Sequence, residues 1–138
     1  MARETTLVLI KPDGMERRLA GEIMARFERR ELELRGARVL KISKAMGREH
    51  YAEHKGKPFF DGLVDFISSA PVLALAVSGE SAISVVRTMM GATNPLDSAP
   101  GTIRGDFALE LSENIVHGSD SKVSARREIA LFFPDGLV

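Results

Sequence analysis

Three histidines, His50, His54 and His117, have the widest range of possible chemistry in this chain. An imidazole can act as a base, a metal ligand or a nucleophile, because its neutral form is abundant at pH 7. His117 closes the short apolar run 115–116 and is followed directly by Gly118. A strand that ends in histidine and turns at glycine presents the ring at the edge of a sheet. A histidine that packs in the core or caps an element is the alternative that these residues leave open.

The other two histidines lie in the segment 50–54, HYAEH, which matches the H-x-x-E-H pattern of some zinc proteases. Two imidazoles four residues apart on one helix face can share a metal ion. A third ligand would have to come from elsewhere, the segment is short, and lysines follow it. We therefore interpret His50, Glu53 and His54 as a solvated helix face, and the sequence predicts no metal ion held by the protein.

Phosphate binding has no glycine-rich loop to rely on, because neither G-x-x-x-x-G-K-[ST] nor G-x-G-x-x-G occurs in the chain. A phosphate site would have to be built from separate side chains. Arg87, Thr93 and Arg104 are candidates, since the planar guanidinium donates two parallel hydrogen bonds to phosphate. Taken singly, each arginine is also compatible with an ordinary surface cation.

Residues 114–121, NIVHGSDS, resemble the active-site signature of nucleoside diphosphate kinases, N-x-x-H-[GA]-S-D. Similar stretches of the same family follow one another in the expected order and spacing, so the resemblance covers nearly the whole chain. They are residues 6–14, 51–64, 91–107 and 125–133.

The resemblance implies that the protein transfers the γ-phosphate of a nucleoside triphosphate to a nucleoside diphosphate by a ping-pong mechanism. By similarity, His117 is the nucleophile and becomes a phosphohistidine. Glu128 would orient its imidazole through a hydrogen bond, and Ser119 would pair with Glu128. Which ring nitrogen is attacked stays open at this point. A nucleotide-sensing domain without catalysis is the alternative on the same scaffold.

The resemblance also implies contacts to the sugar and phosphates, and a Mg²⁺ ion carried mostly by the nucleotide's phosphates and water. Lys11 would reach the ribose hydroxyls and the phosphates, and Asn114 the ribose 3′-hydroxyl. Tyr51 would lie near the histidine. The family's phosphate contacts correspond to Arg87, Thr93, Arg104 and, in some members, His54.

The nucleotide base corresponds in the family to a position on Phe59, with Leu111 opposite. Stacking between apolar faces holds any base without reading its edge, at about 1–3 kcal/mol per base. Broad base specificity is therefore expected. The resemblance further places Leu63, Ile103 and Gly105 along the same slot.

The hydrophobic pattern predicts elements that would position these residues. Strands are predicted over residues 6–10, 35–43, 72–77 and 115–117, and helices over 19–30, 48–55, 60–67, 83–90 and 123–132. Strands that alternate with helices favour an α+β sandwich. The resemblance implies its ferredoxin-like form, a four-stranded antiparallel sheet with helices packed on it, in a single domain over residues 1–138.

Three stretches depart from a regular pattern. Residues 91–113 show little periodicity and are predicted to be a long functional loop around the nucleotide. Glu31 stands where many members of the family end a helix with glycine, so the first long helix is expected to end differently here. Arg35 and Gly36 are typical of an edge strand.

Composition excludes several classes of protein. The 138 residues hold 19 Lys and Arg against 19 Asp and Glu, and no cysteine. Zero net charge argues against nucleic-acid binding as a main role, and the missing cysteines exclude disulfides and thiolate metal sites. No apolar run is long enough to cross a membrane, and the N-terminus has no leader character, so a cytoplasmic location is predicted. The resemblance implies a homo-oligomer, for which we predict a hexamer.

Overall fold

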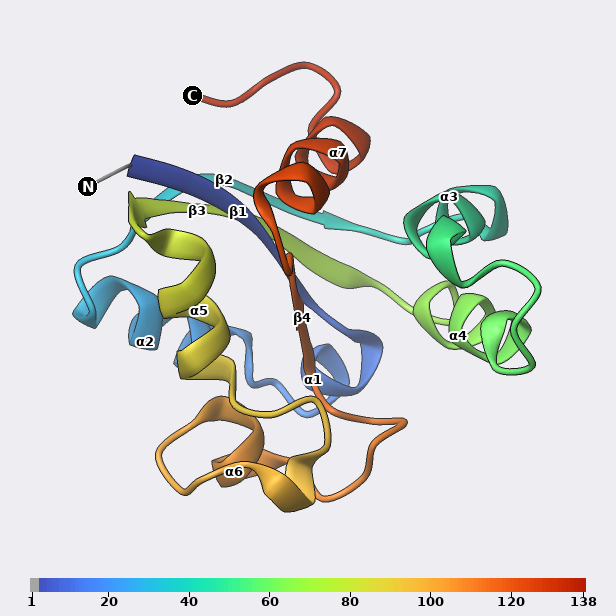
Figure 1. Cartoon of the computed structure of the whole chain (residues 1–138), viewed down its shortest axis with the longest axis horizontal. Helices are drawn as coiled ribbons and strands as arrows, with labels where there is room; N and C mark the ends of the chain where they lie inside the picture. Colours follow the sequence, from blue (N-terminus) through green and yellow to red (C-terminus); the bar gives the residue numbers. More distant parts are fainter. Residues whose placement is uncertain (1–2) are drawn as a thin grey trace.

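The computed structural model describes residues 3–138 and contains a four-stranded antiparallel sheet with helices on both faces (Figure 1). Met1 and Ala2, part of the N-terminal stretch discussed above, lie outside the described residues. The strand order is β2-β3-β1-β4, which confirms the predicted ferredoxin-like sandwich. The strands are β1 (Arg3–Ile10), β2 (Glu33–Leu40), β3 (Val72–Glu80) and β4 (Val116–Gly118).

The two central strands, β1 and β3, are buried on both faces, which explains why their sequences are continuously apolar rather than alternating. Val8 and Ile10 face one core and Leu7 and Leu9 face the other. Strand β2 lies at the edge of the sheet and carries an irregularity between Leu34 and Gly36. The edge-strand prediction is confirmed.

The helices divide between the two faces. Buried residues of α2, α5 and α6 join the core of Val8 and Ile10, whereas α4 and α7 join the core of Leu7 and Leu9. No helix among residues 3–138 combines the length and the apolar character that spanning a bilayer requires. The helical elements are α1 (Pro12–Glu16), α2 (Ala20–Arg29), α3 (Lys44–His50), η1 (Ala52–His54), α4 (Phe60–Ile67), α5 (Ala82–Met90), η2 (Pro95–Asp97), α6 (Ile103–Phe107) and α7 (Lys122–Phe132).

The segment 91–113 is more ordered than predicted, because it contains η2 and α6. Each is too short to show a hydrophobic period, and side-chain caps define their starts instead. The Asn94 side chain accepts from the backbone N–H of Leu96, and the Thr102 hydroxyl accepts from that of Gly105. Likewise, α3 begins at Lys44 rather than near residue 48, where the side chain of Ser43 caps it.

The end of α2 corrects a second prediction. Glu31 adopts the left-handed conformation, with φ of 63°, and its N–H donates to the carbonyl of Glu28. The helix therefore ends in the conformation that favours glycine, although glutamate is present. Glu31 is exposed, so its side chain meets no packing constraint there.

Candidate active site

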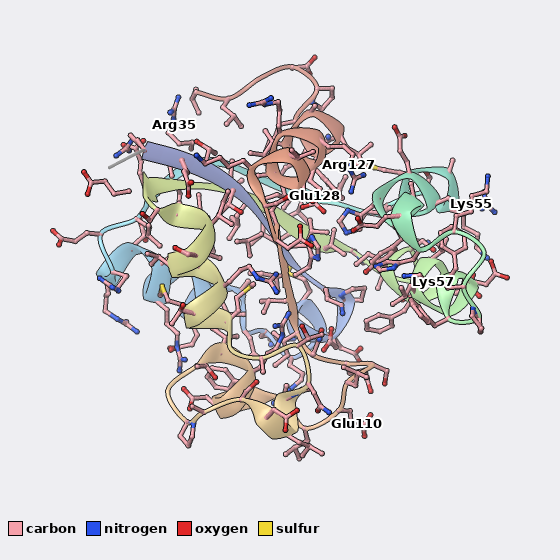
Figure 2. All side chains as sticks on the ribbon, in the orientation of Figure 1. Arg35, Lys55, Lys57, Glu110, Arg127 and Glu128 are labelled. Carbon is pink, nitrogen blue, oxygen red and sulfur yellow. The ribbon has the colours of Figure 1, made fainter. Side chains whose placement is uncertain are left out.

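A cleft of about 770 Å³ opens where β4, α3, α4 and α7 meet, and it gathers residues from distant parts of the chain. In Figure 2, Glu128 lies in the middle part of the molecule, whereas Lys55 projects at its periphery. Ser119 does not line the cleft; it is buried and bonds to Glu128. The predicted residues that line it are Lys11, Tyr51, His54, Phe59, Arg87, Thr93, Arg104, Leu111, Asn114, His117 and Glu128.

Leu63 also lines the cleft, but Ile103 and Gly105 do not. Ile103 is fully buried in the core beneath α6. Gly105 packs against the backbone of Ala99, so closely that a Cβ atom there would clash. Both residues therefore shape the segment that carries Arg104 rather than the surface of the cleft, which corrects that expectation.

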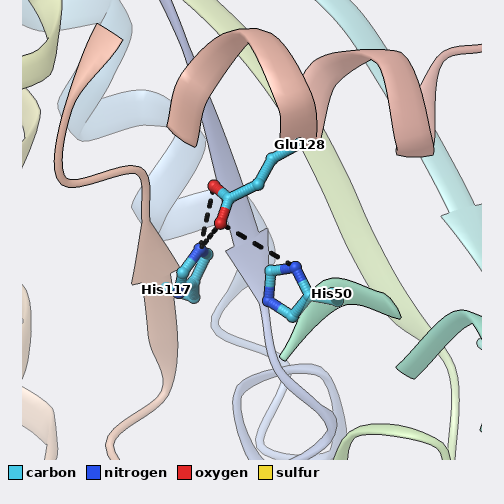
Figure 3. A group of neighbouring side chains, drawn as sticks. All are labelled: His50, His117 and Glu128. Atoms are coloured by element: carbon cyan, nitrogen blue, oxygen red, sulfur yellow. Dashed lines mark hydrogen bonds and ion pairs between the residues drawn. The ribbon is translucent and has the colours of Figure 1, made fainter. Parts of the chain in front are cut away.

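His117 and Glu128 form the centre of the site (Figure 3). His117 on β4 has its Nε2 atom 3.2 and 3.1 Å from the two carboxylate oxygens of Glu128 on α7. The Ser119 hydroxyl donates to Glu128 Oε1 at 2.6 Å. Burial alone would raise the pKa of the Glu128 carboxyl, but the hydrogen bonds and charge of His117, with Ser119, outweigh it and lower that pKa. The carboxylate therefore stays ionised beside the imidazole.

Figure 3 also shows His50 facing the same carboxylate, which the sequence did not predict. Its side chain is fully buried, and its ring meets the His117 ring edge-on with centroids 4.7 Å apart. Burial, with the charge of His117 adding to it, lowers the pKa of His50 to about 3. The interpretation of His50 and His54 as one solvated face is wrong, because His54 lies apart, partly exposed, with Phe59 and Lys57 as neighbours.

Lys11 directly follows β1, and its side chain lines the cleft. Its Nζ donates to Asn114 Oδ1 at 2.8 Å, and Asn114 Nδ2 donates to the carbonyl of Thr93. Burial lowers the pKa of Lys11 to about 8, with Asp13 opposing and Arg104 adding to that shift. The turn after the first strand is thus tied to the segment just before β4.

The backbone just before the histidine is strained. Ile115 has φ of 73°, which a β-branched residue rarely adopts. Its N–H donates to Asp13 Oδ2 at 2.9 Å and its carbonyl accepts from the N–H of Lys11 at 2.8 Å. A Cβ atom at Gly14 would lie 2.8 Å from Ile10 Cγ2, so glycine is needed under this crossing. The turn at Lys11 and Asp13 therefore holds Ile115 in this conformation through two hydrogen bonds, and Ile115 leads directly into β4, which carries His117.

Two arginines face the cleft with different support. Arg87 on α5 makes one hydrogen bond, to the carbonyl of Gly118. Arg104 on α6 is buried, and burial with the charge of Arg87 lowers its pKa to about 10. The guanidinium of Arg104 donates to the carbonyls of Gly91, Ala92, Asn114 and Val116. It therefore serves the fold as well as the cleft.

The opposite end of the cleft is apolar and open. Phe59 is 51% exposed and Leu111 is 57% exposed, although both line the cleft. Tyr51, between this end and the histidine, is nearly buried; burial and the Glu128 charge raise its pKa to about 12, so its hydroxyl keeps its proton. A flat apolar group can enter at Phe59 while anionic groups lie against Lys11 and the arginines.

Comparison with known proteins assigns this arrangement to a family. A family model described as nucleoside diphosphate kinase matches residues 4–138. A nucleoside diphosphate kinase from Rubrobacter xylanophilus is 58% identical over 130 residues, covering 94% of this chain and 98% of that protein. One from Archaeoglobus fulgidus is 55% identical over 132 residues, covering 96% of this chain and 87% of that protein.

Solved structures agree with the sequence relatives. A halophilic nucleoside diphosphate kinase from Halobacterium salinarum, solved in complex with CDP, superposes with a TM-score of 0.96. It is 49% identical in sequence, and the match covers 99% of this chain and 92% of that chain.

Proposed function

Because the chain belongs to the nucleoside diphosphate kinase family and transfers phosphate between nucleotides, we propose that His117 carries the phosphoryl group between donor and acceptor. A nucleoside triphosphate would phosphorylate the imidazole, and a nucleoside diphosphate would then collect the group. The observation that carries this proposal is the pairing of His117 Nε2 with the buried, Ser119-bonded carboxylate of Glu128 at the wall of a cleft lined with cations.

That pairing indicates which nitrogen reacts. In the neutral ring one nitrogen holds a proton and the other a lone pair. Glu128 accepts a hydrogen bond from Nε2–H, so the lone pair resides on Nδ1 of His117. Nδ1 would attack the γ-phosphorus in line: an Nδ1–P bond forms, and the bond to the bridging oxygen of the diphosphate breaks. The ionised carboxylate stabilises the positive charge that develops on the ring.

The cations of the cleft would neutralise the phosphates. Phosphoryl transfer leaves the protein mainly positioning and charge stabilisation to supply. Lys11, Arg87 and Arg104 line the same cleft, with the Thr93 backbone tied to Asn114 beside them. We propose that Mg²⁺ would arrive with the nucleotide, carried mostly by its phosphates and water, where it would help to neutralise their charge. Mg²⁺ prefers oxygen ligands, and the imidazoles of His50 and His117 beside Glu128 supply only nitrogen, which supports an ion carried by the phosphates rather than by the protein.

The open apolar end supports broad base specificity. Phe59 and Leu111 offer faces for stacking, and stacking is tolerant of base identity. His54 lies near Phe59, with ring centroids 5.4 Å apart, so a phosphate contact of His54 would have to come from that side of the cleft.

Assembly and location remain proposals. We propose one domain over residues 1–138 and a homo-oligomer, most simply a hexamer. Exposed apolar side chains on the edge strand and near α6 support self-association: Val39, Leu96 and Leu109. Sedimentation or scattering tests the hexamer, and a stable dimer or tetramer at micromolar concentration contradicts it. A cytoplasmic location and the lack of a main role in nucleic-acid binding stay predictions.

Labelling tests the phosphohistidine. Incubation with ATP labelled on its γ-phosphate should give an acid-labile, base-stable phosphoprotein, and each unlabelled nucleoside diphosphate should remove the label. His117→Gln should abolish the label, whereas His54→Gln should still incorporate it. Label in His117→Gln would contradict the proposal. Nucleotide binding without any label in the unmodified protein would favour the nucleotide-sensing alternative.

A further inference from the structure

His50 has no part in the mechanism above, yet it occupies the heart of the site. Its side chain is fully buried, and neither ring nitrogen has a hydrogen-bond partner among residues 3–138. A buried polar group left without a partner destabilises the fold. The neutral imidazole of His50 therefore keeps a lone pair that could bind a metal ion, and no residue uses that lone pair among those that the structure describes.

The neighbours of His50 complete a metal-ligand set. Glu128 Oε2 lies 3.1 Å from His117 Nε2 and 3.9 Å from His50 Nδ1 (Figure 3). One ligand atom from each of the three residues lies within 4.8 Å of the others. In a tetrahedral zinc site with bonds of about 2.0–2.1 Å, ligand atoms lie roughly 3.3 Å apart. A small inward shift of His50 would close the triangle.

We propose that the nucleotide-free cleft binds one transition-metal dication of the Zn²⁺ type through His50, His117 and Glu128. Two imidazoles and one carboxylate, with a fourth position open to a cleft, are a donor set that zinc takes in proteins. Mg²⁺ requires oxygen ligands in octahedral geometry, so it would not compete for the imidazoles. All three residues line the cleft, which gives the ion a path.

The surrounding charges set the terms of binding. Ser119 bonds Oε1 of Glu128, so Oε2, which accepts from His117 Nε2 in the metal-free site, would face the metal once that nitrogen is bound. Arg127 Nη2 lies 3.7 Å from that same oxygen and opposes a dication. The site is therefore weaker than a structural zinc site and responds to the free metal concentration.

Metal binding would silence the nucleophile, a consequence that rests on the proposed function. When the metal takes Nε2 of His117, the proton on that nitrogen moves to Nδ1 in a tautomeric shift. A metal–nitrogen bond forms, an N–H bond breaks and another N–H bond forms, with no change of oxidation state. Nδ1 then has no lone pair with which to attack phosphorus.

Equilibrium dialysis of the nucleotide-free protein tests the site. Micromolar Zn²⁺ in millimolar Mg²⁺ should give saturable binding of about one ion per chain. His50→Gln should weaken this binding at least roughly tenfold. His54→Gln is the matched control and should bind as the unmodified protein does. Absence of saturable binding, equal binding in both variants, or loss of binding in His54→Gln alone would overturn the proposal.

A second readout needs no substitution and covers the case in which His50→Gln fails to fold. In NMR spectra of the unmodified protein, Zn²⁺ should shift the ring resonances of His50 and His117 and leave those of His54 in place. Shifts confined to His54 would overturn the site.

Phosphorylation kinetics test the consequence. With free Zn²⁺ fixed by a metal buffer, the rate of labelling from ATP should fall in proportion to site occupancy. Undiminished labelling at full occupancy would contradict the tautomer argument. Absence of labelling without any zinc would instead contradict the phosphohistidine, so the two failures are distinguishable.

Discussion

The two ends of the cleft are built in opposite ways. At the phosphate end, the side chains of four residues are held by hydrogen bonds, and each residue is at most 7% exposed: Lys11, Arg104, Asn114 and Glu128. At the base end, Phe59 is half exposed and offers little beyond an apolar face. The phosphate end, where the reaction takes place, is fixed before substrate arrives. The base end offers an apolar surface, which suits a base whose identity varies.

That difference has an energetic side. The lowered pKa values of Lys11, to about 8, and of Arg104, to about 10, show cations that burial has deprived of water. Charged groups in this state cost the fold stability and are stabilised by an incoming anion. The buried cations of the phosphate end therefore lower the stability of the free protein, whereas the base end has no such buried charge.

The largest effect is expected from Glu128→Ala. Without the carboxylate, His117 loses the partner that fixes its tautomer and stabilises its developing charge. The rate of phosphorylation by a nucleoside triphosphate should fall by about 100-fold in single-turnover measurements. Affinity for ADP should change little, because Glu128 orients the ring rather than gripping the nucleotide. Asp120→Asn, another carboxylate of the cleft, is the control, and a large loss of ADP binding in Glu128→Ala would make Glu128 a structural residue.

The two arginines separate binding from stability. Arg104→Ala should lower the free energy of unfolding by about 3 kcal/mol, because buried carbonyls lose their donor. Arg87→Ala removes a single such bond and should cost less than about 1 kcal/mol. Both should weaken nucleoside diphosphate binding. Urea denaturation measures the free energy of unfolding of both variants, and titration calorimetry measures their nucleotide binding. Equal free energies of unfolding would show that Arg104 does not stabilise the fold more than Arg87 does.

Alkaline pH should discharge the phosphate end selectively. Because the pKa of Lys11 is lowered to about 8, its amine is charged below that pH and neutral above it. The value of kcat/KM should therefore fall above pH 8, approaching about tenfold per pH unit for one essential proton. Lys11→Arg should retain activity to higher pH, since guanidinium keeps its proton. A Lys11→Arg profile that breaks at the same pH would assign the break to another group.

The smallest effect belongs to the base end. Phe59→Ala should weaken binding of every nucleoside diphosphate by about tenfold, the equivalent of one stacked base. The ratios among bases should stay within about threefold, because no edge is read. Phe59→Leu keeps an apolar surface without an aromatic face, so its affinity for nucleoside diphosphates should lie between those of the unmodified protein and Phe59→Ala. Loss of binding for a single base would show that Phe59 takes part in selection.

The sequence foretold the chemistry better than the geometry. The motif around His117 and the residues that match the family predict most of the residues that line the cleft. The burial of His50 could not be predicted, because its charged neighbours along α3 suggest a solvent-exposed face. Its burial depends on how β4 and α7 pack against α3, which no local sequence pattern shows. Ile115 escaped for a related reason: a β-branched residue carries no local signal for positive φ.

Short elements were the other limit. Periodicity cannot predict η2 and α6, because a hydrophobic period needs more turns than these short helices have. Their capping residues, Asn94 and Thr102, were the available signal. The pairing of Ser119 with Glu128 could be expected only from the family. Ser119 follows β4 and Glu128 lies on α7, and only the three-dimensional structure brings the two side chains together.

The bond from Lys11 to Asn114 joins residues 103 positions apart, and Glu128 arrives later still, on the last helix. During synthesis β1 can pair with β3 once that strand has emerged, whereas Lys11 meets its partner only after Asn114 has followed. A nascent fragment that ends before α7 holds Lys11 and His117 without the carboxylate that orients the imidazole, so rapid phosphorylation has to await the synthesis of α7.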